Sequence, residues 1–282
     1  MNELATIPSA RPAPIILDET GAGRDRRKSI GGSDVAAVMG LSKWKTPFQL
    51  WEEKTGRAVQ EITPEKQALF DRGKRWEEPA FLMLCDELAA RGHTVEMVGN
   101  SRRFQDGEYD FLTCEIDREI RLNGELVNGE LKSVHVFAAK EWGEMDTDEI
   151  PIAYACQTMH GLGITGRRLC VVGALFGADN IVPYIIERDD ETIDAMRAKC
   201  VAFWTDNVQG DVAPDPVNME DMLRIFARVN GRPAEVDEAT AQALYDLAAV
   251  RSQIKAYEGD EESLKFKVCD GIRRAWGIVP SG

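Results

Sequence analysis

The 282-residue chain has few of the residue types that bind transition metals. Its three histidines show no metal-ligand spacing, and its six cysteines are scattered without a CxxC pair. A thiolate zinc site, a four-cysteine iron–sulfur cluster and a disulfide scaffold are therefore not expected. Free thiols in a reducing compartment are the simplest interpretation, which predicts a cytoplasmic protein.

Long apolar runs are also missing. No segment approaches the roughly 18 consecutive apolar residues of a membrane helix, and the first residues lack the apolar core of a signal peptide. We therefore expect no membrane partner. The length and the apolar fraction of 44% suit one large globular domain, or one domain with a small appendage.

Positive charge is scarce overall but is concentrated in one region. The chain carries a formal net charge of −14, yet the window from Arg24 to Arg75 contains twelve basic and seven acidic residues, a net +5. A local basic groove on an acidic protein could bind a polyanion. A solvated face is the commoner explanation of such a segment, so charge alone does not identify a partner.

The pattern of elements divides the chain into a flexible N-terminal arm (residues 1–24), a core (25–214) and an acidic helical C-terminal region (215–282). Caps and periodicity predict helices over 34–39, 47–55, 64–91, 152–164, 190–208, 235–257 and 263–276. Alternation and apolar runs predict strands over 95–98, 111–122, 125–134, 171–176 and 182–187. This order indicates an α/β or α+β fold, with a central mixed sheet flanked by helices and a helical appendage.

Three charged residues stand together in the predicted hairpin. Glu130 and Lys132 are two apart in one strand, so both side chains leave the same face, and Asp117 lies in the preceding strand. Two carboxylates beside an ammonium group suit a hard divalent cation that activates water near a phosphate. A cross-strand charge ladder on an exposed surface is the competing interpretation.

A further carboxylate lies in the third predicted helix. Glu77 falls within the apolar stripe formed by Trp76, Ala80, Phe81 and Leu84, whereas its neighbour points away from that stripe. A carboxylate on a buried stripe is costly unless it is paired or bound to a metal. Glu77 is thus either a third acidic ligand or one partner of a salt bridge, for example with a nearby arginine.

Two polar features are weaker. Tyr154 and Gln157 lie three apart on an otherwise apolar helix and are typical of a half-buried polar pair. The segment Gly31-Gly32-Ser33 is too short for a Walker loop, but its backbone N–H groups at a helix start could bind one phosphate. A simple turn explains it equally well.

As an ordered set, these residues resemble the YqaJ-like viral recombinase family, the phage lambda exonuclease group of the PD-(D/E)XK nucleases. The resemblance spans roughly Arg26 to Pro214. Its motifs are IGGSDVAAVMG (30–40), KTPFQLWEEKTG (45–56), GKRWE (73–77), Asp117, ELK (130–132), Tyr154 with Gln157, YIIERD (184–189) and Phe203-Trp204. Each motif is weak alone, and their order along the chain makes the match specific.

The resemblance implies a Mg²⁺-dependent 5′→3′ exonuclease, with Mn²⁺ able to substitute. Such an enzyme degrades one strand from the end of double-stranded DNA and leaves 3′ single strands for a single-strand annealing protein. It also implies a homo-oligomer, a ring-shaped trimer around DNA, in the cytoplasm of a bacterial host cell.

The resemblance assigns roles by position. Asp117, Glu130 and the Leu131 carbonyl match the metal ligands, Glu77 the helix acid and Lys132 the lysine that activates water. Gln157 matches a supporting residue of the catalytic site, and Tyr154 is a possible further support. Arg26 and Ser33 match the groups that hold the 5′-phosphate, with Arg27 or Lys28 as alternatives to Arg26.

Two departures from the family pattern keep alternatives open. Arg118 replaces the usual small residue after the first acid, so Asp110 is a reserve candidate for that acid, and the acidic tail matches nothing in the family. A restriction-type or Cas4-like endonuclease of the same fold is the nearer rival, although the Cas4-like form requires a four-cysteine cluster. A non-catalytic DNA-end-binding scaffold is the rival from another class.

Overall fold

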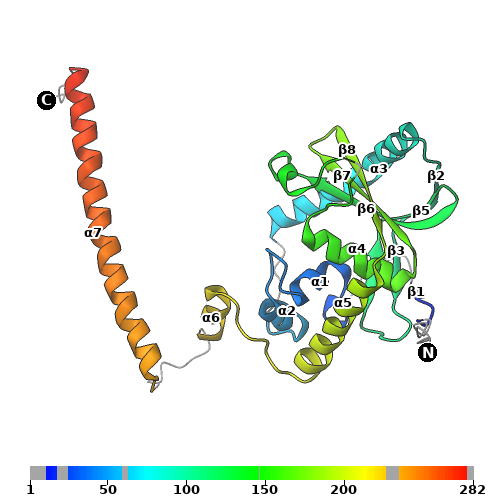
Figure 1. Ribbon diagram of the computed structural model, residues 1–282, viewed down its shortest axis with the longest axis horizontal. Helices are drawn as coiled ribbons and strands as arrows, with labels where there is room; N and C mark the ends of the chain where they lie inside the picture. The colour runs from blue at the N-terminus through cyan, green and yellow to red at the C-terminus, as the bar shows by residue number, and fades with distance from the viewer. Residues whose placement is uncertain (1–10, 18–24, 59–62, 146, 227–234, 278–282) are drawn as a thin grey trace, which may run out of the picture. The chain divides into compact units, whose positions relative to one another are not determined.

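The computed structural model describes residues 11–17, 25–58, 63–145, 147–226 and 235–277 (Figure 1). The chain divides into two compact units, Met1–Ile225 and Phe226–Gly282. Among the described residues, no helix combines the length and the apolar character needed to cross a membrane.

A five-stranded mixed sheet forms the centre of the first unit, in the order β2-β5-β6-β7-β8. Its strands are β2 (Val95–Gly99), β5 (Arg118–Leu122), β6 (Glu125–Val134), β7 (Leu169–Phe176) and β8 (Asn180–Glu187). β6 and β7 are parallel, and the other neighbours are antiparallel. The predicted hairpin between β5 and β6 is confirmed: Asn123 and Gly124 both adopt positive φ, as a tight hairpin turn requires.

Helices cover both faces of this sheet (Figure 1). α3 (Pro64–Ala90) packs Phe81, Leu84 and Leu88 against one face, together with Val171 and Leu175. The alternate residues of β7 face α4 (Ile152–Thr165) and α5 (Asp190–Ala202). Both faces of β7 are therefore buried, which explains its continuous apolar sequence. The predicted α/β class, with a mixed sheet flanked by helices, is confirmed.

A second, three-stranded sheet has the order β1-β3-β4, with β1 (Ile15–Leu17), β3 (Arg102–Gln105) and β4 (Thr113–Ile116). The predicted arm therefore contributes a strand, while residues 1–10 and 18–24 lie outside the described residues. The single strand predicted over 111–122 is wrong. β4 pairs with β3, whereas β5 pairs with β2 and β6, and the chain changes sheet at Asp117.

The N-terminal helices complete the first unit. A single 3₁₀ turn, η1 (Arg26–Lys28), precedes α1 (Gly32–Val38) and α2 (Pro47–Lys54). Thr46 caps α2 through a hydrogen bond from the backbone of Gln49, and Pro47 occupies the first helical position, as predicted. Further along the chain, η2 (Val136–Glu141) is a short helix after β6, and the π-helical η3 (Phe203–Gln209) continues α5.

The first unit continues past the predicted core boundary at Pro214. In α6 (Met219–Phe226), the fully buried Asp221 accepts a hydrogen bond from Thr46 Oγ1 at 2.8 Å. Arg224 donates to the buried carboxylate of Glu52 at 3.2 Å. These contacts with α2 explain why the first unit extends through Ile225.

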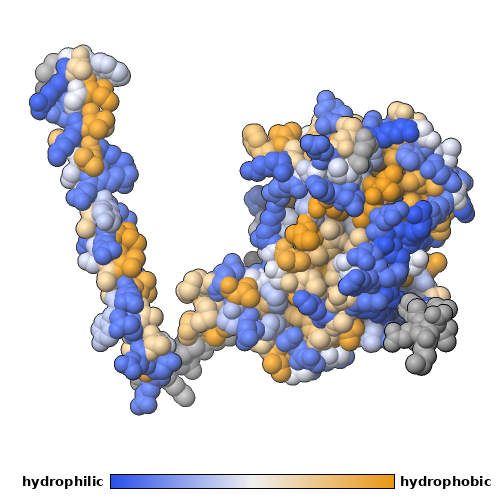
Figure 2. Space-filling view, viewed as in Figure 1, coloured by the Kyte–Doolittle hydropathy of each residue, from blue (hydrophilic) through white to orange (hydrophobic). Residues whose placement is uncertain are grey.

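The described residues of the second unit from 235 to 277 form one helix, α7 (Glu238–Ala275), of 38 residues. The two helices predicted over 235–257 and 263–276 are thus continuous. Asp237 caps the helix by accepting a hydrogen bond from the backbone of Thr240. Apolar residues are interspersed with hydrophilic ones along its length (Figure 2). Its large apolar residues, including Ile254 and Phe266, are exposed.

Candidate active site

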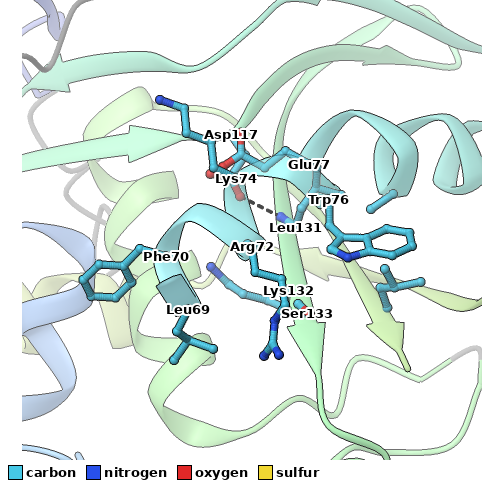
Figure 3. A pocket seen from close by; sticks show the side chains of 13 residues that line it. Leu69, Phe70, Arg72, Lys74, Trp76, Glu77, Asp117, Leu131, Lys132 and Ser133 are labelled. Carbon is cyan, nitrogen blue, oxygen red and sulfur yellow. Dashed lines mark hydrogen bonds between the residues drawn. The ribbon is translucent and has the colours of Figure 1, made fainter. Parts of the chain in front are cut away.

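Asp117 lies at the point where the chain leaves β4 and enters β5. Its backbone N–H donates to the Gly129 carbonyl at 3.1 Å, and its Oδ2 accepts a hydrogen bond from the Leu131 N–H at 2.8 Å. The carboxylate therefore lies against β6 beside the Glu130–Lys132 segment (Figure 3). Asp117 belongs to neither strand, because β4 ends at Ile116 in one sheet and β5 begins at Arg118 in the other.

Glu130, Lys132 and Gln157 form a closed hydrogen-bonded cluster. Lys132 Nζ donates to Glu130 Oε2 at 2.8 Å and to Gln157 Oε1 at 3.2 Å. Gln157 Nε2 in turn donates to Glu130 Oε2 at 2.8 Å. Glu130 is only 4% exposed. The amide of Gln157 thus fixes the positions of both the carboxylate and the ammonium group, a geometry that the sequence could suggest only through the family resemblance.

Burial and neighbouring charges set the protonation of this cluster. Burial raises the pKa of Glu130 to about 7, and the charge of Asp117 adds to the shift while Lys132 opposes it. For Lys132, burial opposes the charged form, but the negative charges of Glu130 and Asp117 outweigh it and raise the pKa. Lys132 therefore remains an ammonium group at neutral pH.

Glu77 reaches the same neighbourhood from α3. Together with Asp117, Lys132 and Leu131 it lines a cavity of about 400 Å³ (Figure 3). Partial burial raises the pKa of Glu77, and the charge of Asp117 raises it further. From the sequence, Glu77 is either a third acidic ligand or one partner of a salt bridge, and its role at this cavity stays a prediction.

The oxygen donors around the cavity are of the type that a hard divalent cation prefers. The carboxylates of Asp117 and Glu77 face one cavity and repel each other, and a cation between them would relieve that repulsion. Within the described ranges, no three His, Cys, Asp or Glu side chains gather closely enough to form a metal site. The Glu130 carboxylate lies instead against Lys132 and Gln157.

The start of α1 carries a second polar group of residues. Arg26 Nη2 donates to Ser33 Oγ at 2.9 Å, so the two residues assigned to the 5′-phosphate are in contact. Arg27 instead forms two hydrogen bonds with Asp25, which occupies its guanidinium group. Of the two arginines, Arg26 therefore lies at Ser33.

A buried lysine holds this segment in place. Lys54 Nζ donates to the carbonyls of Arg26 and Ser29, at 2.8 and 2.7 Å, and to Asp34 Oδ2 at 2.7 Å. Asp34 Oδ2 also accepts a hydrogen bond from the Gly31 N–H. Although burial disfavours the Asp34 carboxylate, the Lys54 ammonium lowers its pKa below the ordinary value. Lys54, one of the basic residues of the Arg24–Arg75 window, therefore has a structural role.

The two polar groups are joined through Gly32. A Cβ on Gly32 would lie 3.0 Å from Cγ of Gln157 and 3.7 Å from its carbonyl oxygen. α1 therefore begins directly against the side chain that holds Glu130 and Lys132. This contact links the helix that carries Ser33 to the residue that binds Glu130 and Lys132.

The first departure from the family pattern, Arg118, has a structural explanation. Arg118 is buried and donates to Glu78 Oε2 at 2.9 Å, with its guanidinium group 5.4 Å from the Phe81 ring. Its side chain is thus bound to α3. The reserve acid Asp110 is exposed in the turn between β3 and β4, whereas Asp117 lines the cavity.

Among the further residues around the site, Arg72 and Lys74 belong to the basic window of the sequence, whereas Trp44 carries no signal. Arg72 and Lys74 line the cavity from α3 and add positive charge to it. Trp44 lies in the loop between α1 and α2, with its ring 6.3 Å from that of Tyr154. Lys132 Nζ lies 5.4 Å from the Tyr154 ring. A loop residue without periodicity gives no pattern from which such a neighbour could be found.

The protein is thus an α/β fold in which Glu77, Asp117 and Lys132 line one cavity, Glu130 is bound to Lys132, and Arg26 contacts Ser33. The model of the YqaJ-like viral recombinase domain matches residues 23–168, just over half of the chain. The chain belongs to this family, which confirms the resemblance found in its motifs.

A curated relative, the uncharacterized protein YqaJ of Bacillus subtilis (strain 168), is 29% identical over 288 residues, which cover 96% of this chain and 85% of the relative. Among solved structures, LHK-Exo in complex with dAMP is 21% identical and has a TM-score of 0.48, covering 72% of this chain and 95% of that chain. LHK-Exo is an alkaline exonuclease from Laribacter hongkongensis. A phage-related exonuclease from Haemophilus somnus 129PT has a TM-score of 0.44 and 15% identity, covering 64% and 94%.

Proposed function

We propose that this chain is a Mg²⁺-dependent exonuclease that hydrolyses one strand of double-stranded DNA from its 5′ end. The observation that carries the proposal is the position of Gln157. This residue binds Glu130 and Lys132 and also touches Gly32, next to the Arg26–Ser33 pair. A terminal 5′-phosphate bound at Ser33 would bring the first phosphodiester bonds of that strand toward Lys132.

The residues fit a divalent cation in donor type. Asp117 and Glu77 would hold it, with Glu130 and the Leu131 carbonyl as further ligands, and Mn²⁺ would substitute for Mg²⁺ because both accept oxygen donors. When bound, the cation supplies Lewis acidity and neutralises phosphate charge. The mutual repulsion of Asp117 and Glu77 supports this assignment.

Lys132 has a role that follows from its protonation state. Since the pKa of Lys132 is raised, its ammonium group does not accept a proton at neutral pH. It orients the attacking water and stabilises the negative charge that develops on the phosphate. Gln157 keeps the ammonium group in place through its Oε1. Attack breaks the bond between phosphorus and the 3′-oxygen and releases a nucleotide with a 5′-phosphate.

The proposal extends to the biological reaction. The family is one of viral recombinases, so we propose that the 3′ single strands produced serve a single-strand annealing protein. A ring-shaped trimer around DNA would keep the enzyme on its substrate. The excess of basic residues from Arg24 to Arg75 would bind phosphates without selecting a base sequence.

The test uses 5′-phosphorylated linear duplex and covalently closed circular DNA, with Mg²⁺, Mn²⁺ or a chelator. We expect the linear DNA to lose nucleotides from its 5′ ends with either metal and the circle to remain intact. Nicking of the circle would indicate an endonuclease, and binding of ends without hydrolysis would indicate a scaffold.

Variants assign the activity to the site. Lys132→Ala should retain binding to DNA ends and lose nucleotide release, because the substitution removes the ammonium group that stabilises the phosphate. Lys140→Ala, which changes an exposed lysine on η2, is the matched control and should remain active. Undiminished hydrolysis by Lys132→Ala would overturn the proposed site.

A further inference from the structure

A second cavity, of about 460 Å³, lies next to the proposed active site. It is lined by Trp44 and Lys43 from the loop after α1, Trp142 after η2, and Tyr154 of α4. Ser133 lines both this cavity and the one that contains Asp117 and Lys132. Ser133, the residue before the last of β6, is thus common to both cavities.

Trp44, Trp142 and Tyr154 contribute aromatic rings to the lining of this second cavity. The Trp142 ring lies 5.5 Å from that of Tyr154 and 5.3 Å from that of Tyr184, and it is buried. Trp44, by contrast, is 62% exposed, although its ring lies 6.3 Å from Tyr154. A large indole exposed at the mouth of a cavity whose inner rings are fixed can cover a flat ligand without displacing the core.

A lysine ammonium group, paired with a carboxylate, lies near the ring of Tyr154 and another near that of Trp44. Lys132 Nζ is 5.4 Å from the Tyr154 ring, and Lys43 Nζ is 5.4 Å from the Trp44 ring. Lys43 is also paired with Glu141, at 2.6 Å, which holds it at the rim. A flat aromatic ligand attached to phosphates fits this arrangement, because its ring meets the indole while its phosphates meet the ammonium groups.

We propose that this second cavity is a nucleobase-binding site for the DNA strand held at Lys132, with Trp44 as the stacking residue. This proposal rests on the proposed function, and it adds a binding site for a base of the DNA substrate. Stacking on an aromatic ring accepts any of the four bases, so the site holds the strand without selecting its sequence. It also requires the base to be unpaired, which favours a separated strand end.

The test compares two probes of equal charge in the presence of a chelator, so that no strand is cut. One is 5′-phosphorylated hexathymidylate, and the other is a hexamer of abasic sugars with the same phosphates. Binding is measured by titration with the full-length protein. We expect the wild type to bind the thymidylate roughly tenfold more tightly than the abasic strand, as stacking of one base allows.

Three variants locate the effect. Trp44→Ala should bind both strands equally, Trp44→Phe should retain most of the preference, and Trp276→Ala, which removes an exposed tryptophan outside the cavity, should match the wild type. Because Trp44 is exposed, these changes should leave the thermal unfolding midpoint unchanged. Equal binding of the two strands by the wild type, or an unchanged preference in Trp44→Ala, would overturn the site.

The outcome is separable from the proposed function. If the protein discriminates the two strands but hydrolyses no DNA, the nucleobase site is supported and the exonuclease proposal is wrong. If the protein degrades linear duplex but binds both strands equally, the exonuclease proposal is supported and the nucleobase site is wrong.

Discussion

Gly32 and Gln157 are in contact across the interface of α1 and α4: a methyl group on Gly32 would lie 3.0 Å from Cγ of Gln157. The helix that begins at the phosphate-binding residues is therefore packed on the amide that positions Glu130 and Lys132. A displacement of α1 should therefore move the Gln157 side chain, and with it Glu130 and Lys132.

Gly32→Ala tests this contact. The added methyl group should displace the Gln157 side chain and weaken its hold on Lys132, so kcat for nucleotide release should fall roughly tenfold, since small displacements of positioning residues have large effects. Stability should change little, because alanine favours a helix over glycine by about 1 kcal/mol and offsets the strain. Gly259→Ala in α7, where nothing lies within 4 Å of the added group, is the control and should leave kcat unchanged. An unchanged kcat in Gly32→Ala would contradict the coupling.

The two arginines of η1 should differ in their effect on substrate ends. Arg26 contacts Ser33, whereas Arg27 is held by Asp25. Arg26→Ala should raise KM for 5′-phosphorylated duplex about 10- to 100-fold, the value of one lost charge-assisted hydrogen bond. It should have little effect on duplex with a 5′-hydroxyl end. Arg27→Ala should leave the preference for the phosphate intact, and the reverse result would transfer the role to Arg27.

The stability of the metal-free protein should depend on pH through Glu130. Its pKa rises from an ordinary 4.5 to about 7 because the carboxyl group is buried. Between these two values the folded state retains a proton that the unfolded state has lost, so the stabilising contribution disappears as pH rises. The loss amounts to about 3 kcal/mol at most. Glu130→Gln should lack this decline, and denaturant titrations of both proteins from pH 4 to 8 in a chelator measure it. If the free energies of unfolding of the wild type and Glu130→Gln changed in parallel with pH, the pKa of Glu130 would not be raised in the folded protein.

The sequence predicted the elements that depend on local signals. Thr46-Pro47 begins a helix and Asn123-Gly124 makes a hairpin turn because capping and positive φ are properties of those residues. The break at Asp117 could not be predicted, since the alternation of apolar residues continues through it and only pairing with distant strands divides it.

The candidate site shows the same limit. Glu77 could be found because a carboxylate on an apolar stripe needs a partner. Glu119, which shares strand parity with Asp117 as an exposed edge would, is instead buried and paired with Arg102 and Arg167. These partners are distant in sequence, and no periodicity connects them. Likewise, Trp44 lies in a loop, where position is set by tertiary contacts.

Two truncations distinguish the observed end of the first unit from the predicted one. A chain that ends at Ile225 keeps Asp221 bound to Thr46 and Arg224 bound to Glu52, whereas a chain that ends at Pro214 loses both contacts. Asp221 and Glu52 are both buried, at 0% and 2% exposure. The shorter chain therefore lacks the buried hydrogen bond between Asp221 and Thr46, and its buried Glu52 carboxylate lacks the ion pair with Arg224.

We expect the shorter chain to lose about 3 kcal/mol of stability, which lowers Tm by roughly 6–12 °C for a chain of this size. The chain that ends at Ile225 should unfold at the same temperature as the first unit of the full-length protein, and it should still release nucleotides. Calorimetry of the three proteins measures the difference. Asp221→Asn in the longer truncation is the matched point variant, since it removes the charge and keeps the shape. Equal midpoints for both truncations would show that α6 contributes nothing to the first unit.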